Sequence, residues 1–225
     1  MSAGAASGTS PETVAARGES TLILYGGTFD PVHEGHLAVA NAVAAAAGQS
    51  VALMPAALPP HRAEPGASDR HRLAMLRCAL RDQPQLRCDD RELRRQGASY
   101  TVLTLRDCIA AGERPALVLG WDAFCGLPSW REPDAIRALA ILIVLPRPQP
   151  MPLPESLQAA WAARQPLSAA NLAKAGPGDV LFCTMPEHPA SATAIRAALH
   201  AGEPHPIGLP PAVADYIREH HLYAS

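Results

Sequence analysis

Short apolar runs alternate with longer segments of helical period from residue 21 onward. Six runs predict strands: "TLILY" (21–25), "VALMP" (51–55), "LRCDD" (86–90), "ALVLG" (116–120), "ALAILIVL" (138–145) and "VLFCT" (180–184). Most of them are continuously apolar, which is typical of strands that are covered on both faces of a parallel sheet. The alternation itself indicates repeated βαβ units. The pattern therefore predicts an α/β fold with a doubly wound parallel sheet.

The segments between the apolar runs predict the helices that flank this sheet. Their ranges are 37–47, 69–81, 100–111, 192–200 and 211–220. Ser68 and Ser99 each stand directly before a helical pattern, where a hydroxyl can accept from the free N–H groups of the first turn. The last two ranges predict a small C-terminal helical part beside a Rossmann-like sheet.

Two stretches differ in amino-acid composition from the rest of the chain. Residues 1–20 are rich in Ala, Gly, Ser and Thr and predict a disordered tail, which leaves 21–225 as a single domain. The second stretch, 146–178, begins with "PRPQPMPLPE", in which five of ten residues are proline. We expect it to be an excursion over the surface.

Composition narrows the function classes. A formal net charge of −2 argues against a broad basic face, so nucleic acid is not an expected partner. Five cysteines without a C-x-x-C pair favour reduced thiols in a cytoplasm over disulfides or a zinc site. The N-terminal residues lack the basic start and apolar block of a signal peptide, and no apolar run approaches the ~18 residues of a membrane span.

The stretch "YGGTFDPVHEGHL" (25–37) carries the most chemistry. Gly26, Gly27 and Thr28 end a strand, and the helix that follows brings its N-terminus to the carboxyl edge of the sheet, where anions bind. His33 and His36 are three positions apart, so both imidazoles can project from one side of the first turn. Gly35, between them, would leave room for a ligand.

Other interpretations of this stretch remain open at this point. H-x-G-H alone is equally consistent with a glycine turn and with surface or capping histidines. A zinc site needs three or four protein ligands, and no Cys or His partners converge in the sequence. The glycines fit neither the Walker pattern nor G-x-G-x-x-G. The preceding strand and G-G-T-F-D-P favour a phosphate site of another kind.

"GGTFDPVHEGHL" resembles the signature of the nucleotidylyltransferase superfamily, and its full form resembles bacterial nicotinate-nucleotide adenylyltransferases. Further segments along the chain resemble the same family: "LPPHR" (58–62), "DRHRLAMLRCAL" (69–80), "ELRRQGASYTVLTL" (92–105), "LGWDAFCGLPSW" (119–130), "SATAIR" (191–196) and "VADYIREHHLY" (213–223). Three positions depart from the family pattern: Arg62 replaces a common Lys, Leu103 replaces Asp, and Ala192 replaces a Ser.

The resemblance implies transfer of the adenylyl group of ATP to nicotinate mononucleotide, with Mg²⁺ bridging the phosphates and no protein metal ligands. It implies catalytic roles for His33, His36 and Arg196, as donors to the phosphates. The implied ATP-binding residues are Gly26, Gly27, Thr28, Phe29, Gly35, Gly120, Asp122, Ser191 and Thr193. The implied mononucleotide-binding residues are Tyr100, Thr101, Trp130 and Arg62.

Taken without the family, several of these residues have simpler interpretations. Asp122 can be a helix N-cap, Trp130 can be packing, and Arg196 can be a solvated side chain. The alternatives for function are an adenylyltransferase for another acceptor, nicotinamide mononucleotide or phosphopantetheine, and a nucleotide-binding regulator without turnover. The oligomeric state stays open, with a homo-oligomer as one alternative.

Overall fold

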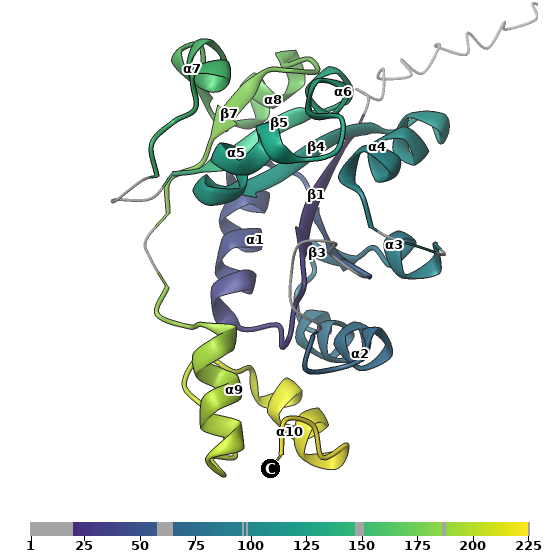
Figure 1. Ribbon diagram of the computed structural model, residues 1–225, viewed down its shortest axis with the longest axis vertical. Helices are drawn as coiled ribbons and strands as arrows, with labels where there is room; N and C mark the ends of the chain where they lie inside the picture. The colour runs from purple at the N-terminus through teal and green to yellow at the C-terminus, as the bar shows by residue number, and fades with distance from the viewer. Residues whose placement is uncertain are drawn as a thin grey trace, which may run out of the picture.

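The computed structural model describes residues 20–57, 65–95, 97, 99–146, 151–185 and 188–224. Within these residues the strands form one sheet in the order β3-β2-β1-β4-β5-β7-β6, and each pair of neighbours is parallel (Figure 1). The strands are β1 (Thr21–Gly27), β2 (Val51–Pro55), β3 (Leu86–Cys88), β4 (Arg114–Gly120), β5 (Ile141–Leu145), β6 (Gln165–Pro166) and β7 (Val180–Phe182). The expected parallel α/β sheet is confirmed.

The order of the strands reverses between β1 and β4. From β1 the chain moves through β2 to β3 on one side, and from β4 it moves through β5 to β7 and β6 on the other. In sheets of this kind a crevice opens outside the carboxyl ends of the two strands where the order reverses. Here those ends are Gly26 and Gly27 of β1 and Gly120 of β4.

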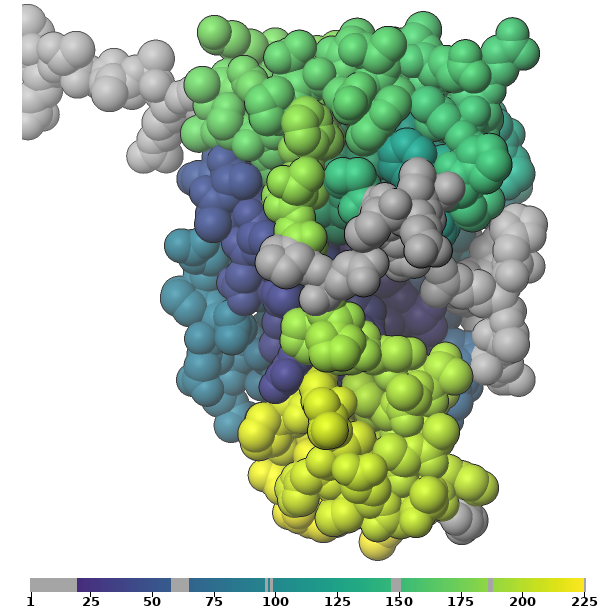
Figure 2. Space-filling view, turned by 90° about the vertical axis from the view of Figure 1, so that its left-hand side faces the viewer, coloured from purple at the N-terminus to yellow at the C-terminus, as the bar shows by residue number. Residues whose placement is uncertain are grey.

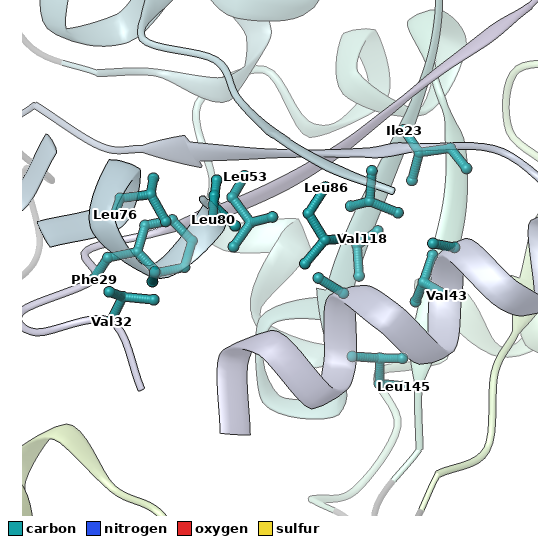
Figure 3. Packing of buried hydrophobic residues seen from close by; sticks show 14 of the residues in the cluster. Ile23, Phe29, Val32, Val43, Leu53, Leu76, Leu80, Leu86, Val118 and Leu145 are labelled. Atoms are coloured by element: carbon teal, nitrogen blue, oxygen red, sulfur yellow. The ribbon is translucent and has the colours of Figure 1, made fainter. Parts of the chain in front are cut away.

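Helices cover both faces of the sheet. They are α1 (Glu34–Ala47), α2 (Asp69–Leu80), α3 (Arg91–Arg94), α4 (Thr101–Ala110), α5 (Trp121–Gly126), α6 (Pro133–Leu139), α7 (Glu155–Ala162), α8 (Ala169–Lys174), α9 (Ala192–His200) and α10 (Pro211–Glu219). Because strand side chains alternate between faces, Ile23 packs with α1 and α2 whereas Leu22 and Leu24 pack with α4 and α6. These residues form two hydrophobic core clusters, the first on the face of α1 and α2 and the second on the face of α4 and α6. Figure 3 shows the first cluster, which contains Ile23, Leu53 and Val118 from three strands and Val43 of α1.

The two C-terminal helices lie at one end of the molecule. Figure 2 shows this lime-to-yellow part beside the purple and blue N-terminal residues. Helix α10 packs against α2, and Ile195, Val213 and Ile217 belong to the same core cluster as β1 and α1. The last helices are therefore packed against α2 and against the core that β1 and α1 share.

One of the two predicted caps is correct. Ser68 is the N-cap of α2, and its hydroxyl accepts from the His71 N–H at 3.4 Å. Ser99 is not a cap, because α4 has Tyr100 as its N-cap. The Ser99 hydroxyl instead accepts from the Ala57 N–H at 3.1 Å, which joins the α4 end to the segment after β2.

Two predicted boundaries need correction. The apolar run 138–145 is only partly strand, because residues 138 and 139 end α6 and β5 starts at Ile141. The stretch 146–178 is not simply a surface excursion, since it supplies α7, the edge strand β6 and α8. Leu157, Leu167 and Leu172 from this stretch are buried in the two core clusters. Between β4 and α6 the chain forms α5 and a 3₁₀ turn, Leu127–Ser129.

A search of the described residues for a helix long and apolar enough to cross a membrane finds none. The five cysteines are all free thiols.

Candidate active site

The segment from residue 28 to residue 36, which joins β1 to the first turn of α1, is tightly packed and is called the strap. Phe29 adopts left-handed backbone geometry (φ 50°), and the Asp30–Pro31 peptide bond is cis. The Phe29 ring is 1% exposed and lies over Gly27, where an added Cβ would come within 2.8 Å of it. Gly27 therefore makes room for this ring. Any contact between Phe29 and a nucleotide goes through its backbone.

His33 and His36 stack on each other in the first turn of α1, with ring centroids 3.7 Å apart. His33 is the N-cap residue, and its backbone N–H donates to Nδ1 of His36 at 3.2 Å. Because Nδ1 accepts this bond, a neutral His36 carries its proton on Nε2. The fold thus sets the tautomer in which Nε2 is the donor.

Both imidazoles are neutral at pH 7. Burial lowers the pKa of His33 to about 4, with a further contribution from the charge of His188. Burial also lowers the pKa of His36 to about 3, with repulsion from His33 as the second cause. Each ring therefore offers a single N–H donor rather than a positive charge before an anion binds.

This depression predicts how stability depends on pH. Since the pKa of His33 is about 4 in the folded chain and 6.5 in the unfolded chain, the unfolded state binds the proton first as the pH falls. The contribution of His33 to the free energy of unfolding is therefore fully present above pH 6.5. It is lost as the pH falls toward 4, a decline of about 3 kcal/mol. We expect urea titrations between pH 4 and 7 to show a slope to which both His33 and His36 contribute, and His33→Gln to reduce that slope by the share of His33. The exposed His205, changed to Gln, is the matched control; an equal slope in His33→Gln would contradict the assignment.

Gly35 makes room for protein atoms and not, as expected, for a ligand between the histidines. An added Cβ would lie 3.1 Å from Cε1 and Nδ1 of His33 and 3.5 Å from the carbonyl oxygen of Ala190. The glycine therefore makes room for the His33 ring and for the segment that leads into α9. The space between the histidines is not open to a ligand, because the two rings are stacked.

The segment "SATAIR" lies next to the histidine strap, although 155 residues separate them. Ser191 is the N-cap of α9, and Thr193 is exposed in its first turn. Nη1 of Arg196 donates to the carbonyl oxygen of Asp30 at 2.7 Å and lies 3.8 Å from its carboxylate. Glu34, the first residue of α1, donates its N–H to the Gly208 carbonyl at 2.9 Å, which also ties the C-terminal part to the strap.

Asp30 connects four segments of the chain and was not predicted as a site residue. Its buried carboxylate accepts from the N–H groups of Gly66 (2.8 Å) and Ala67 (3.0 Å) and from the Tyr223 hydroxyl (2.6 Å). Burial and the bond to Asp30 raise the pKa of Tyr223, so its hydroxyl remains a donor. The only sequence signals for this arrangement were the Asp of "FDP" and the Tyr near the C-terminus.

Arg72 is a second functional candidate that sequence reasoning missed. Its side chain is 1% exposed, and its guanidinium donates to the carbonyl oxygens of Thr28 (2.7 Å) and Ala57 (3.1 Å). Desolvation lowers the pKa of Arg72, and the nearby Asp30 carboxylate opposes that effect. The buried guanidinium therefore fixes the carboxyl ends of β1 and β2 beside the strap.

A cavity of about 430 Å³ opens at the point where the strand order reverses, within the range of ~300–1,000 Å³ that is typical of small-molecule sites. It is lined by eight residues predicted for the site: Gly26, Gly27, Thr28, Tyr100, Thr101, Gly120, Asp122 and Trp130. An added Cβ at Gly120 would meet no atom within 4 Å, so the end of β4 leaves open space there. Asp122 is in the first turn of α5, whose N-cap is Gly120, so it is not a helix N-cap.

The other predicted residues lie outside this lining. His33, His36, Gly35, Phe29, Ser191, Thr193 and Arg196 belong to the strap and α9, and Arg62 lies outside the described residues. Leu103, where the family pattern has Asp, packs against the second core cluster. Next to it, Arg95 donates to the Thr104 hydroxyl (3.1 Å) and pairs with Asp107. Gly26, Gly27 and Thr28 line the cavity, and Tyr25, which lines it too, has its ring centroid 6.4 Å from that of His36.

Sequence comparison finds relatives of this chain. The family model "Cytidylyltransferase-like" matches residues 24–198. A protein of Stenotrophomonas maltophilia described as "Probable nicotinate-nucleotide adenylyltransferase" is 43% identical over 92% of this chain and 98% of its own length. The chain belongs to the nicotinate-nucleotide adenylyltransferase family. Members of this family with the same description from Pseudomonas aeruginosa and Xylella fastidiosa are 42% and 39% identical over 89% and 91% of this chain, and 95% and 96% of their own lengths.

Solved structures support the fold of this adenylyltransferase family member. Plasmodium falciparum nicotinic acid mononucleotide adenylyltransferase, complexed with NaAD, superposes with a TM-score of 0.66 at 18% identity, over 91% of this chain and 97% of that chain. The same enzyme complexed with APC gives a TM-score of 0.62 at 17% identity, over the same shares of the two chains. At this level of identity the likeness concerns the fold.

Proposed function

We propose that this chain transfers the adenylyl group of ATP to nicotinate mononucleotide, forming nicotinate adenine dinucleotide and pyrophosphate in NAD biosynthesis. The observation that carries the proposal is an aromatic cavity of about 430 Å³ at the carboxyl ends of β1 and β4, next to the strap, which carries His33 and His36 and contacts Arg196. Tyr25 lines this cavity, and its ring centroid lies 6.4 Å from that of His36. Relatives 39–43% identical over about nine tenths of the chain carry the same activity in their names.

The reaction asks little covalent chemistry of the protein. A phosphate oxygen of the mononucleotide forms a bond to the α-phosphorus of ATP, and the bond from that phosphorus to the pyrophosphate oxygen breaks. Because the attacking phosphate is already ionised at pH 7, no strong general base is needed. Catalysis then rests on positioning and on donors aimed at the charge that develops on the phosphoryl oxygens.

The strap supplies those donors. Nε2–H of His36, set by the bond from the His33 N–H to Nδ1, donates to an α-phosphate oxygen in the transition state, and His33 donates beside it. Thr28 and the neighbouring backbone, with Gly26, Gly27, Gly35 and Phe29, border the bound ATP. In the transition state these contacts strengthen, which is what lowers the barrier.

The α9 end holds the departing pyrophosphate. Arg196 already projects to the strap, where it donates to the Asp30 carbonyl, and its planar fork suits the β- and γ-phosphates. Ser191 at the N-cap and Thr193 in the first turn of this nine-residue helix add hydroxyl donors at its positive end.

The cavity holds the acceptor. Trp130 stacks on the pyridine ring, and the Tyr100–Thr101 segment at the N-terminus of α4 contacts the nicotinate carboxylate. Gly120 and Asp122 line the cavity at the end of β4 and border a bound nucleotide. Arg62, which lies outside the described residues, stays a predicted contact of the mononucleotide.

Mg²⁺ fits this site as part of the nucleotide substrate. The described residues contain no group of three or more His, Cys, Asp or Glu side chains able to hold a metal ion, and the Asp30 carboxylate already accepts bonds from Gly66, Ala67 and Tyr223. Mg²⁺ commonly takes its ligands from substrate phosphates and water. It would neutralise phosphate charge, while the residues above orient the reacting groups.

The proposed partners are ATP and nicotinate mononucleotide, in a reducing cytoplasm that suits the five free thiols. The other hypotheses are an acceptor such as nicotinamide mononucleotide or phosphopantetheine, and a regulator that binds nucleotide without turnover. Both hypotheses keep phosphate binding by the strap. They differ from the proposed function in what enters the aromatic cavity or in whether product forms.

Pyrophosphate release with each acceptor separates these functions. The full chain with ATP and Mg²⁺ is expected to release pyrophosphate quickly with nicotinate mononucleotide and at least tenfold more slowly with its amide, and not at all with phosphopantetheine. Faster release with the amide or with phosphopantetheine would assign another acceptor. Binding of ATP without release for any acceptor would favour the regulator.

A further inference from the structure

Arg131 lies at the acceptor cavity and has no role so far. It follows Trp130 directly and precedes Glu132 and the proline that starts α6. Both Trp130 and Arg131 line the cavity of about 430 Å³. The side chain of Arg131 is 56% exposed, so its guanidinium is accessible from the cavity.

An aromatic ring holds this guanidinium in place. Its central carbon lies 4.7 Å from the centroid of the Tyr100 ring, a distance at which the ring face attracts a cation. Tyr100 is the N-cap of α4, a helix of ten residues. The cation of Arg131 and the positive end of α4 therefore lie on the same wall of the cavity.

Arg131 shares the neighbouring Glu132 carboxylate with a closer partner, Arg106. Glu132 Oε1 lies 3.8 Å from Nε of Arg131, longer than a hydrogen bond. Arg106 from α4 donates to both carboxylate oxygens of Glu132, at 3.2 and 2.5 Å. Hydrogen bonding to Arg106 lowers the pKa of Glu132, which keeps Glu132 ionised and paired with Arg106.

Among the described residues that line the cavity, Arg131 is the only cation. The acidic lining residues are Asp122 and Glu92, of which Glu92 accepts from the Thr104 hydroxyl at 2.7 Å. The described lining of the cavity therefore carries two acidic side chains and one basic side chain.

We propose that Arg131 is a specificity-determining residue that pairs with the carboxylate on the pyridine ring of the acceptor. This inference rests on the proposed function, whose acceptor carries two anionic groups, a ring carboxylate and a 5′-phosphate. The phosphate must reach the α-phosphorus beside His33 and His36, which are not part of the cavity lining. The ring carboxylate stays with the aromatic wall of Tyr100 and Trp130, where the Arg131 guanidinium lies. A planar fork matches a carboxylate in two parallel bonds.

Steady-state kinetics and calorimetric binding with both mononucleotides test this assignment in the full chain. Arg131→Ala is expected to raise KM and Kd for the acid about tenfold, a moderate effect for a half-exposed charge-assisted pair, and to change those for the amide less than about twofold. Arg131→Lys, which keeps the charge without the fork, should be intermediate. Arg218→Ala, which removes an arginine of similar exposure on α10 (62% exposed), is the matched control and should match the wild type.

Each outcome decides the inference. Equal losses for acid and amide would place Arg131 at the phosphate that both share and overturn the carboxylate assignment. Unchanged constants for both acceptors would remove Arg131 from recognition. Failure of the proposed function is visible separately, because the wild type would then release no pyrophosphate with the acid, and the calorimetric comparison of acid and amide binding would still decide the role of Arg131.

Discussion

Replacing His36 by Asn lowers kcat by about two to three orders of magnitude, the usual loss when one transition-state donor is removed. The Asn side chain can still accept from the His33 N–H, as Nδ1 of His36 does at 3.2 Å, so the start of α1 is retained. What it lacks is a donor at the position of Nε2. The expected change is therefore in kcat with little change in KM for ATP, measured by pyrophosphate release under saturating substrates.

His36→Gln provides the matched comparison. Its terminal amide can place an N–H near the position of Nε2, so we expect it to recover part of the lost rate. Thermal unfolding of both variants should resemble that of the wild type. A correctly folded His36→Asn chain with unchanged kcat would remove His36 from the mechanism.

Replacing Asp30 by Ala is expected to cost about 3 kcal/mol or more of the free energy of unfolding, because it leaves buried donors without an acceptor. The carboxylate accepts from Gly66, Ala67 and Tyr223, and it also faces the buried guanidinium of Arg72. The same change loosens the strap that Arg196 contacts, so we expect KM for ATP to rise as well. Urea denaturation and steady-state kinetics measure the two effects.

Two milder variants keep this prediction testable if Asp30→Ala does not fold. Asp30→Asn preserves the shape but turns one oxygen into a donor that faces other donors, so it should be less stable than the wild type. Tyr223→Phe removes one hydrogen bond with almost no change in volume and should cost about 1 kcal/mol. Wild-type stability in both variants would show that the Asp30 cluster does not hold these segments together.

Much of the fold could be predicted from the apolar runs. Strands buried on both faces need continuous apolar residues, so "VALMP" and "ALVLG" predicted β2 and β4 correctly. The same continuity concealed the end of α6 in "ALAILIVL", because Ala138 and Leu139 at that helix end are as apolar as the buried strand that follows. The edge strand β6 is two exposed residues, Gln165 and Pro166, and has no periodic signal at all.

Tertiary contacts explain the remaining differences. Ser99 could have capped α4, but its hydroxyl accepts from the Ala57 N–H, 42 residues away. Local patterns carry no information about such a partner. The same holds for Asp30, two of whose partners are backbone N–H groups that any residue could supply.

Some of the candidate site residues could be predicted from sequence motifs, and others depend on tertiary contacts. The histidine pair and "SATAIR" were recognisable as motifs, and the fold brings them together through the bond from Arg196 to the Asp30 carbonyl. Arg72 and Arg131 have no distinctive spacing. Their positions depend on which carbonyls and which ring the fold brings to each guanidinium, and only the structure provides this information.

The most direct test follows the α-phosphate of ATP. With ATP labelled at the α-phosphorus, nicotinate mononucleotide and Mg²⁺, the full chain should place one label in nicotinate adenine dinucleotide for each pyrophosphate released. Label recovered as free AMP, or no labelled dinucleotide with this acceptor, would contradict adenylyl transfer to nicotinate mononucleotide.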